Sequence, residues 1–489
     1  MTADAHYRPM REEPQASPYR PDPAIVALAN WLADPVEPAS FPSATLRFRN
    51  RRWDPAVGLG ELDDEAWVEH FARFAPLPGN LPGPLALRYH GHQFRVYNPE
   101  IGDGRGFLFA QLRDGAAHGS GRLLDLGTKG SGTTPHSRTA DGRLTLKGAV
   151  REILATEMLE ALGVYTSKTF SVIETGEELW RGDEPSPTRS AVMVRLSHGH
   201  IRIGTFQRLL ALEEREHMAE LVDYCLAQFP GPQPPADAPG RSEPAVILMH
   251  QVVERLADLA ASWMAAGFVH GVLNTDNMNV TGESFDYGPW RWLPRWDSSF
   301  TAAYFDRSGL YAFGRQPEAV HWSLGQFAVA LRLLADAPSL IAALERFGPL
   351  YMAAVARRWC WRLGVESRGA ERDGALVAAC EAAMRESGAQ PDAFFYRHRG
   401  GRGAEGGLAE ALDGYRATAT DHPYWTEDHP ESMLIDEVET IWSAIDQRDD
   451  WKPLEEKIVS VRRMGAAHGE PPPPSGHGAA NDRGRAQRH

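Results

Sequence analysis

The sequence predicts an α+β fold in two lobes, a strand-rich N-terminal lobe followed by a helical C-terminal lobe. From about residue 85 to residue 204, short apolar alternations are broken by glycines, the pattern of strands and tight turns. After about residue 205, apolar residues recur at helical spacing over longer runs. The 489 residues, 43% of them hydrophobic, are enough to bury a core in each lobe.

The strand-rich lobe, expected at residues 85–204, holds three predicted strands and one helix. The strands are predicted at 106–112, 123–129 and 190–195, where apolar runs are bounded by glycine and polar turns. Before the third strand, apolar residues from Leu146 to Leu162 line one face of a predicted helix that stops at Gly163.

The helical lobe is expected at residues 205–464. A helix with apolar positions from Val252 to Met264 is predicted to end near Gly267, and further helices are predicted around 317–335, 338–364, 369–387 and 431–446. Residues 23–84 form a predicted N-terminal extension. The polar, proline-rich residues 1–22 and the Pro/Gly tract at 465–489 are expected to be disordered.

Composition narrows the class of protein. A formal net charge of −14 argues against a general nucleic-acid binder, which needs a basic surface. No apolar run approaches the roughly 18 residues of a membrane span and no signal-peptide pattern is present, so we expect a soluble protein. Cys225, Cys360 and Cys380 lie far apart without metal-ligand spacing, which favours a reduced, cytoplasmic setting.

The stretch "HGVLNTDNMNVTGESFDYGP" (270–289) resembles the H-G-D-L-x-x-x-N and D-x-G motifs of aminoglycoside and choline kinases. Val272 stands where those kinases carry the aspartate that receives the proton of the attacking hydroxyl. Asn277 and Asp286 match the metal ligands, an amide oxygen and a carboxylate that suit Mg²⁺ or Mn²⁺. Asp276 is a carboxylate within the loop itself and could replace the missing base.

Three features upstream of this stretch, a glycine-rich turn, a lysine and a glutamate, are also expected in a site that binds phosphates. The glycines of "IGDGRG" (101–106) would let backbone N–H groups approach an anion, although a hairpin turn explains them equally. Lys129 ends a predicted strand and Glu152 lies on the next helix, the order in which kinases form a Lys-Glu ion pair on the phosphates. Ordinary surface charges are the alternative.

Two arginines and two histidine pairs complete the set of candidates. Arg195 and Arg202 flank "LSHGHI" and could hold phosphate oxygens bidentately, with solvated charges as the alternative. The pairs His90/His92 and His198/His200 have no cysteine or carboxylate at matching spacing, so we expect them to be structural and not zinc ligands.

With these residues gathered, the sequence resembles the selenoprotein O family, also called YdiU, of kinase-like protein adenylyltransferases. The matching motifs span about half of the chain and comprise "YHGHQF" (89–94), "GDGRG" (102–106), "TKGSGTTPHSR" (128–138), "DGR" (141–143), "REILATE" (151–157), "HIRIGTF" (200–206), the 270–289 stretch and "QPEAVHWSL" (316–324). The resemblance implies a protein-kinase-like bilobal fold.

The resemblance also implies a reaction. ATP would lie inverted relative to a kinase, and AMP would pass to a Ser, Thr or Tyr hydroxyl of a protein, with this protein itself as one candidate substrate and pyrophosphate as the leaving group. Asp276 would accept the proton, Asn277 and Asp286 would bind Mg²⁺ or Mn²⁺, and Lys129 would contact phosphate and pair with Glu152. The nucleotide site would also include Gly102, Gly104, Arg105, Asp141, Gly142, Arg195, Arg202 and Asp286.

The sequence departs from the family pattern at three places. The spacer 95–101 lacks the usual glycines, "HGHIRI" replaces the usual E-S-H-I-R-F, and no cysteine follows Cys380, so redox control at the tail is not expected. Two other functions stay open: a metal-dependent kinase in which Asp276 serves the γ-phosphate, acting on a small molecule or a protein, and a non-catalytic scaffold of the pseudokinase type that binds nucleotide. The protein substrates, the preferred metal and the oligomeric state are not readable from the sequence.

Overall fold

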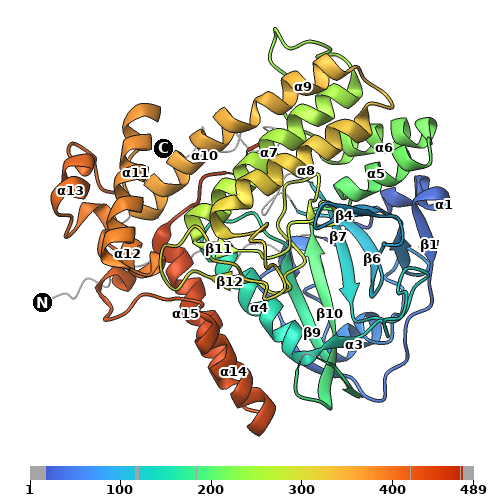
Figure 1. The fold of residues 1–489 in the computed structure, drawn as a ribbon. Helices are drawn as coiled ribbons and strands as arrows, with labels where there is room; N and C mark the ends of the chain where they lie inside the picture. The colour runs from blue at the N-terminus through green and yellow to red at the C-terminus, as the bar shows by residue number, and fades with distance from the viewer. Residues whose placement is uncertain (1–17, 116–120, 183, 419, 474, 477–489) are drawn as a thin grey trace, which may run out of the picture.

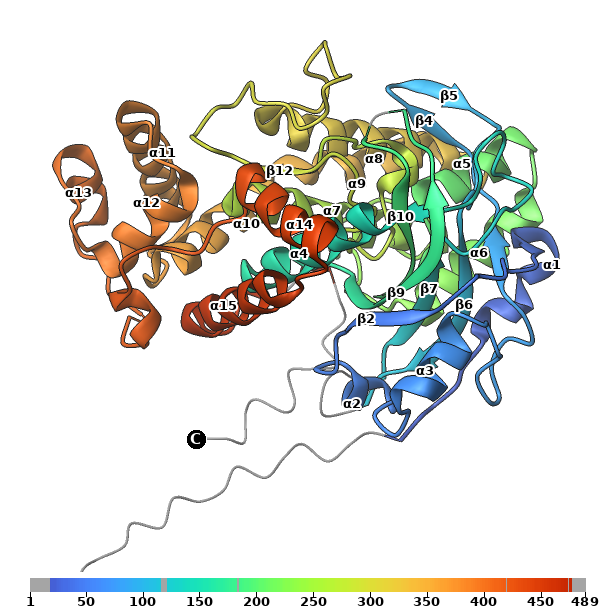
Figure 2. The ribbon, with the colours of Figure 1, turned by 90° about the horizontal axis from the view of Figure 1, so that it is seen from below.

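The computed structural model describes residues 18–115, 121–182, 184–418, 420–473 and 475–476. It has a mixed architecture, with one large antiparallel sheet and a set of helices beside it (Figure 1). Seen from below, the sheet occupies one side of the molecule and helices α11 (Ala370–Ser387), α12 (Pro391–Arg397) and α13 (Gly406–Leu412) the opposite side (Figure 2). This agrees with the predicted α+β class.

The main sheet has eight strands in the order β1-β3-β6-β7-β10-β9-β2, with β8 paired to β10. Their bounds are β1 (Ala33–Pro35), β2 (Thr45–Arg49), β3 (Leu85–Leu87), β6 (Gly106–Arg113), β7 (Leu123–Lys129), β8 (Leu144–Thr145), β9 (Lys168–Leu179) and β10 (Thr188–Ser197). The three predicted strands correspond to β6, β7 and β10, which are neighbours at the centre of the sheet and are almost entirely buried.

Residues 23–84, predicted as an extension, supply both edges of this sheet. Strand β1 pairs with β3 at one edge and β2 pairs with β9 at the other. The same segment adds four short helical elements, η1 (Ala24–Ala27), α1 (Ala29–Leu32), α2 (Asp54–Val57) and α3 (Asp64–Phe71). Helix α4 (Leu146–Ala161), capped by the Thr145 hydroxyl accepting from the Gly148 N–H, packs on β9 and β10 and corresponds to the predicted 146–162 helix.

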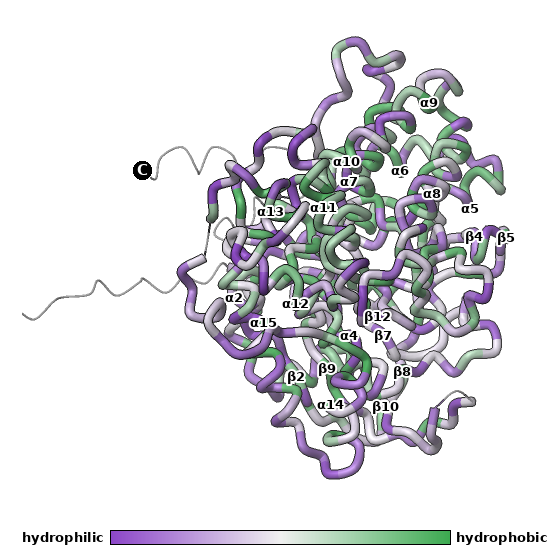
Figure 3. The backbone as a smooth tube through the Cα atoms, turned by 60° about the vertical axis from the view of Figure 1, so that its left-hand side comes forward, coloured by the Kyte–Doolittle hydropathy of each residue, from purple (hydrophilic) through white to green (hydrophobic). Residues whose placement is uncertain are grey.

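Helix α7 (Pro244–Ala266) is the centre of the helical region. It is buried on nearly all sides, its charged residues Arg255 and Asp258 included, and Figure 3 shows it as mostly hydrophobic. It ends where Gly267 takes the left-handed conformation (φ 64°). The helices around it are α5 (Ile203–Ala211), α6 (Arg215–Gln228), α8 (Gln316–Leu331), α9 (Ala337–Glu345) and α10 (Phe347–Leu363).

The segment after α7 forms a closed loop. Strand β11 (Phe268–Val269) pairs with β12 (Arg291–Trp292), which brings the two ends of residues 270–290 together. Inside this loop, the 3₁₀ turn η2 (Thr275–Asn277) carries Asp276, the predicted proton acceptor, and Asn277, a predicted metal ligand. We call residues 270–290 the catalytic loop.

A small hairpin stands apart from the main sheet. Strand β4 (Gly91–Gln93) pairs with β5 (Val96–Asn98), and the two-residue turn between them is Phe94-Arg95. Much of the spacer whose sequence departs from the family pattern is therefore a strand, β5, followed by a turn.

The remaining elements of the C-terminal region are η3 (Phe313–Arg315), η4 (Arg399–Gly401), η5 (Pro423–Thr426), α14 (Ile435–Arg448) and α15 (Lys452–His468). The predicted tail boundary at residue 465 falls inside α15, and Gly476 accepts a hydrogen bond from Arg255. At the other end, Pro21 bridges to β6. Residues 1–17 and 477–489, also predicted to be disordered, lie outside the described residues.

Two further expectations concern the helical region. Ala337–Leu363 passes a length-and-composition test for a membrane span with a mean hydropathy of 1.2, a test that core helices also pass. In the structure this stretch is α9 and α10, separated at Arg346, and both pack against α7. The three cysteines are buried free thiols, as their spacing predicts.

Candidate active site

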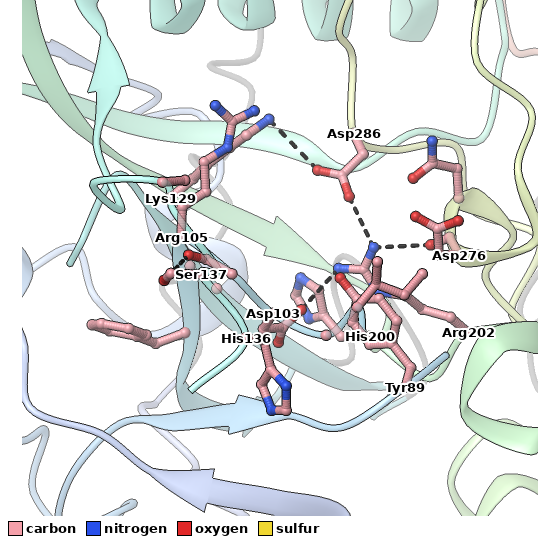
Figure 4. Close-up of a pocket in the computed structure, with 18 of the residues that line it drawn as sticks. Tyr89, Asp103, Arg105, Lys129, His136, Ser137, His200, Arg202, Asp276 and Asp286 are labelled. Carbon is pink, nitrogen blue, oxygen red and sulfur yellow. Dashed lines mark hydrogen bonds and ion pairs between the residues drawn. The ribbon is translucent and has the colours of Figure 1, made fainter. Parts of the chain in front are cut away.

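A cavity of about 470 Å³ lies between the main sheet and the catalytic loop (Figure 4). Its walls come from the glycine turn before β6, the ends of β7 and β10, the 136–140 turn and the catalytic loop. Its lining includes the cations Lys129, Arg195 and Arg202 and the carboxylates Asp276 and Asp286. The strands of the sheet and the β11–β12 pair hold these two sets of residues in place.

Asp286 lies at the centre of a cluster of cations. Its Oδ1 accepts from Arg195 Nη2 at 2.9 Å and lies 3.5 Å from Lys129 Nζ, and its Oδ2 accepts from Arg202 Nη1 at 2.9 Å. Burial opposes ionisation of this carboxyl, but the three positive charges outweigh burial and hold its pKa well below the ordinary value. The residue adopts φ 60°, a conformation rare for non-glycine residues and typical of functional sites.

Lys129 and Glu152 form the ion pair expected from the sequence. Lys129 Nζ donates to Glu152 Oε1, and Arg195 Nη2 donates to Glu152 Oε2 at 3.2 Å. Both Lys129 and Glu152 are buried, so neither is the ordinary surface charge that the sequence left open. Burial lowers the pKa of Lys129, and the negative charges of Glu152 and Asp286 oppose that shift.

Arg202 joins the cation cluster to the catalytic loop. Besides Asp286, its Nη1 donates to the Asp276 carbonyl oxygen at 2.9 Å, and its Nη2 donates to Asp103 Oδ1 at 3.2 Å. Its guanidinium carbon lies 4.5 Å from the centre of the Tyr89 ring and 4.8 Å from that of Phe285. Stacking and the rigid hydrogen-bonding fork fix the orientation of this charge toward the cavity.

Asp276 has the properties of a general base. Its side chain is buried at the wall of the cavity, and its Oδ1 has no hydrogen-bond partner among the residues that the structure describes. Burial raises the pKa of this carboxyl from 3.8 to about 6, although Arg202 pulls it in the opposite direction. A base whose pKa is near the working pH is well matched to proton transfer.

Asn277 and Val272 lie beside Asp276 on the cavity wall. Asn277 Nδ2 donates to the Val272 carbonyl oxygen at 3.0 Å, so its side-chain oxygen is the atom that can bind a cation. Together with the Asp286 carboxylate, it offers oxygen donors that Mg²⁺ or Mn²⁺ accepts. In the described part of the chain no group of three or more His, Cys, Asp or Glu could hold a metal ion, so phosphate oxygens and water would complete the coordination.

The glycine turn at 102–106 packs too closely for side chains. A Cβ on Gly102 would lie 2.5 Å from the His136 ring, and one on Gly104 would lie 3.0 Å from the His136 carbonyl oxygen. The Ser137 hydroxyl donates to the Gly104 carbonyl. Arg105, which follows, lines the cavity and has no carboxylate partner in the described segments.

The structure does not bring Asp141 and Gly142 to the cavity wall. The Asp141 carboxylate is half exposed and accepts from Arg181 at 2.8 and 3.1 Å, while Gly142 packs on the backbone of Gly132. Their predicted contact with nucleotide is therefore not visible in the geometry. Ala140, next to them, does line the cavity.

Several wall residues were not predicted to be part of the site. They are Tyr89, Asp103, His136, Ser137, Arg138 and His200. Each of these residues lies inside one of the motifs that carry the family resemblance. Membership of such a motif is the sequence signal that could have identified them as site residues. The expectation that the histidine pairs are structural fits His200, whose Nδ1 lies 3.0 Å from Asp125 Oδ2.

Comparison with known proteins identifies the family of this chain. A family model described as "Protein adenylyltransferase SelO" matches residues 17–403, which include every candidate site residue. The chain belongs to the SelO family. Its sequence is similar to proteins named "Protein nucleotidyltransferase YdiU": 50% identical over 351 residues to that of Synechococcus elongatus (71% of this chain, 68% of that protein), 41% over 475 residues to that of a Synechocystis species (90% and 97%), and 36% over 375 residues to that of Azotobacter vinelandii (76% and 73%).

The SelO match confirms two predictions from the sequence, the family and the enzyme class of nucleotidyltransferase. The family match ends at residue 403, and the Synechocystis alignment, which covers 90% of this chain, extends beyond that residue.

Proposed function

We propose that this protein is a metal-dependent protein adenylyltransferase with a kinase-like, two-lobed fold, which transfers AMP from ATP to Ser, Thr or Tyr hydroxyls of proteins. One observation supports this most strongly. Asp276, a buried carboxylate whose pKa lies near 6, faces the cation cluster of the cavity, whereas Val272 stands where kinases carry their base. In this proposal the proton acceptor occupies a different position from that of a kinase base, which fits an attack on a different phosphorus atom.

The cations of the cavity fit a triphosphate. Lys129, Arg195 and Arg202 share Asp286 as a counter-ion, and Arg105 adds a fourth positive charge. Phosphate oxygens can replace part of the carboxylate contacts of these side chains, and a buried site makes each charge contact stronger than it is in water. Gly102 and Gly104 of the glycine turn line the cavity and carry no side chains, so a nucleotide can approach their backbone closely.

The transfer step uses Asp276 as the proton acceptor. Its carboxylate removes the proton of the acceptor hydroxyl while the hydroxyl oxygen forms a bond to the α-phosphorus of ATP. The bond between that phosphorus and the oxygen bridging to the β-phosphorus breaks, and pyrophosphate leaves with the bonding electrons. Asp276 is well placed for this role because its Oδ1 has no competing hydrogen bond among the described residues.

Asn277 and Asp286 would hold Mg²⁺ or Mn²⁺ through their side-chain oxygens. When bound, such an ion neutralises phosphate charge that would otherwise repel the attacking oxygen. The Asn277 amide is oriented for this role by its hydrogen bond to the Val272 carbonyl.

The position of the label in ATP tests the proposal. Purified protein is incubated with Mg²⁺ or Mn²⁺ and with ATP labelled at either the α- or the γ-phosphate, using itself and a cell lysate as acceptors. We expect protein-bound label from the α position alone, and none from Asp286→Ala. Label from the γ position alone would instead show a kinase, and nucleotide binding without any transfer would show a scaffold.

A further inference from the structure

The "YHGHQF" motif forms the β4 strand of the small hairpin, and this hairpin lies directly against the catalytic loop. The His92 N–H donates to Thr275 Oγ1 at 2.7 Å, and the Phe94 N–H donates to Asn274 Oδ1 at 3.0 Å. A Cβ on Gly91 would lie 3.1 Å from Asp276 Oδ1. The hairpin backbone therefore contacts three consecutive residues of the loop.

Three side chains close a ring of hydrogen bonds at this contact. Thr275 Oγ1 donates to Gln207 Oε1 at 2.6 Å, and Gln207 Nε2 donates to His92 Nδ1 at 2.7 Å. The His92 N–H donates back to Thr275 Oγ1, which completes the ring. Thr275 is 0% exposed and Gln207 4%, so loss of one member leaves buried polar groups unpaired.

The ring joins three separate parts of the fold, namely the hairpin, helix α5 and the catalytic loop. It requires His92 Nδ1 to be unprotonated, because this atom accepts a hydrogen. Burial lowers the pKa of His92, which favours the neutral imidazole at neutral pH.

The turn of the hairpin is held in a strained conformation. Phe94 and Arg95 have φ angles of 50° and 64°, a region that favours glycine or asparagine. The Phe94 ring packs against Phe305 and Tyr311, and Arg95 Nη2 donates to Glu318 at 2.8 Å. Strain of this kind persists only where surrounding contacts fix the backbone, so the shape of the hairpin is well determined.

We infer that His92, Gln207 and Thr275 are positioning residues that fix the place of Asp276 in the cavity. Asp276 Oδ1 has no hydrogen-bond partner in the described structure, so its location depends on the backbone of the turn, which Thr275 anchors to the hairpin and which Arg202 holds at the Asp276 carbonyl oxygen. This inference rests on the proposed function, since it assigns Asp276 the role of proton acceptor. A displacement of about 1 Å at such a group can reduce the rate about 100-fold.

Thr275→Val tests the ring because it removes the hydroxyl and keeps the shape of the side chain. We expect kcat per ATP-binding site to fall by about 10-fold or more, with the Kd for ATP changed less than about 2-fold, because the cation cluster is untouched. Thr275→Ser keeps the hydroxyl and should retain most of the rate. Thr281→Val removes another fully buried threonine hydroxyl of the same loop, away from the hairpin, and is the matched control.

A second pair of variants covers the case in which Thr275→Val does not fold. His92→Ala removes the acceptor of the Gln207 hydrogen bond, whereas the Oδ1 of His92→Asn can replace Nδ1. We expect the alanine variant to lose rate and the asparagine variant to recover it. Equal rates for the two would overturn the inference.

Hydrogen exchange of residues 91–98 gives a readout that does not depend on transfer. We expect faster exchange of the hairpin amides in Thr275→Val than in Thr275→Ser or Thr281→Val. Unchanged exchange, or faster exchange with an unchanged kcat, would show that the ring does not position Asp276. If the wild-type protein transfers no α-label, the proposed function fails, and exchange alone then decides whether the ring holds the hairpin to the loop.

Discussion

Asp276→Asn should stabilise the folded protein while it slows the reaction. The wild-type carboxyl is buried at the cavity wall, with its Oδ1 unpartnered among the described residues, and burial raises its pKa from 3.8 to about 6. A carboxyl whose pKa is raised in the folded state favours folding at low pH, where it is neutral, and loses that contribution as the pH rises through the folded-state pKa. A neutral amide at this position therefore removes the free-energy cost of burying an ionised carboxylate. The wild-type protein has this cost only at pH values where Asp276 is ionised.

The size of this effect follows from the pKa change. A shift from 3.8 to about 6 corresponds to about 3 kcal/mol, at roughly 1.4 kcal/mol for each unit. The free energy of unfolding of Asp276→Asn should exceed that of the wild type by about 3 kcal/mol at pH 8 and by about half of that at pH 5. The rate of α-label transfer should fall by about 100-fold or more, because the amide cannot accept the proton.

Equilibrium urea denaturation at pH 5 and pH 8, without nucleotide and with EDTA, measures the difference between the two proteins. Asp103→Asn is a matched control, because Asp103 accepts from Arg202 and from the Leu87 N–H and its replacement removes favourable contacts. We expect no gain in stability for this control. An Asp276→Asn protein that is no more stable than the wild type at pH 8, or equally stabilised at both pH values, would refute the reasoning.

Four further outcomes are expected. In steady-state assays, kcat/KM for α-label transfer should rise with pH through about 6, the pKa of Asp276, and then level off; a flat profile would remove this base from the step. Glu152→Gln should lower the free energy of unfolding by about 3 kcal/mol in urea titrations, because Asp286 is then the one carboxylate left to neutralise the cluster of three cations. Lys129→Met should lower the free energy of unfolding by less. Gly102→Ala should weaken ATP binding in calorimetry because its Cβ would meet a ring at 2.5 Å, whereas Gly325→Ala, on helix α8 outside the cavity wall and with nothing else in the described chain within 4 Å of its Cβ, should not; equal affinities would contradict this. Adding EDTA should abolish transfer and adding Mg²⁺ or Mn²⁺ should restore it, and transfer that survives EDTA would exclude the proposed role of Asn277.

Much of the site could be predicted because its residues come from the ends of regular elements. Lys129 closes β7 and Arg195 lies near the end of β10, two strands with clear apolar patterns, and Glu152 lies on a helix whose periodicity is plain. Their convergence follows from the pairing of β7 with β10 and from the packing of α4 on that sheet. Local patterns and a kinase-like motif order were therefore enough to place these charges together.

The parts that could not be predicted depend on contacts between distant segments. Strands β1 and β2 are only 3 and 5 residues long, and they join the sheet through partners far away in the sequence. The ring of His92, Gln207 and Thr275 joins three such segments, and each residue alone looks like an ordinary polar side chain. The role of Asp141 stays a prediction: the motif match includes it in the nucleotide site, whereas in the structure its carboxylate pairs with Arg181 and it does not line the cavity.

The product on the acceptor protein tests the central claim most directly. After reaction of the wild-type protein with ATP and Mg²⁺ or Mn²⁺, peptide mass spectrometry identifies the group that is attached to the modified Ser, Thr or Tyr. We predict adenosine monophosphate on the side-chain oxygen, absent from the product of Asp276→Asn. A phosphate group alone at that oxygen would contradict the attack on the α-phosphorus and would show that Asp276 serves a kinase reaction.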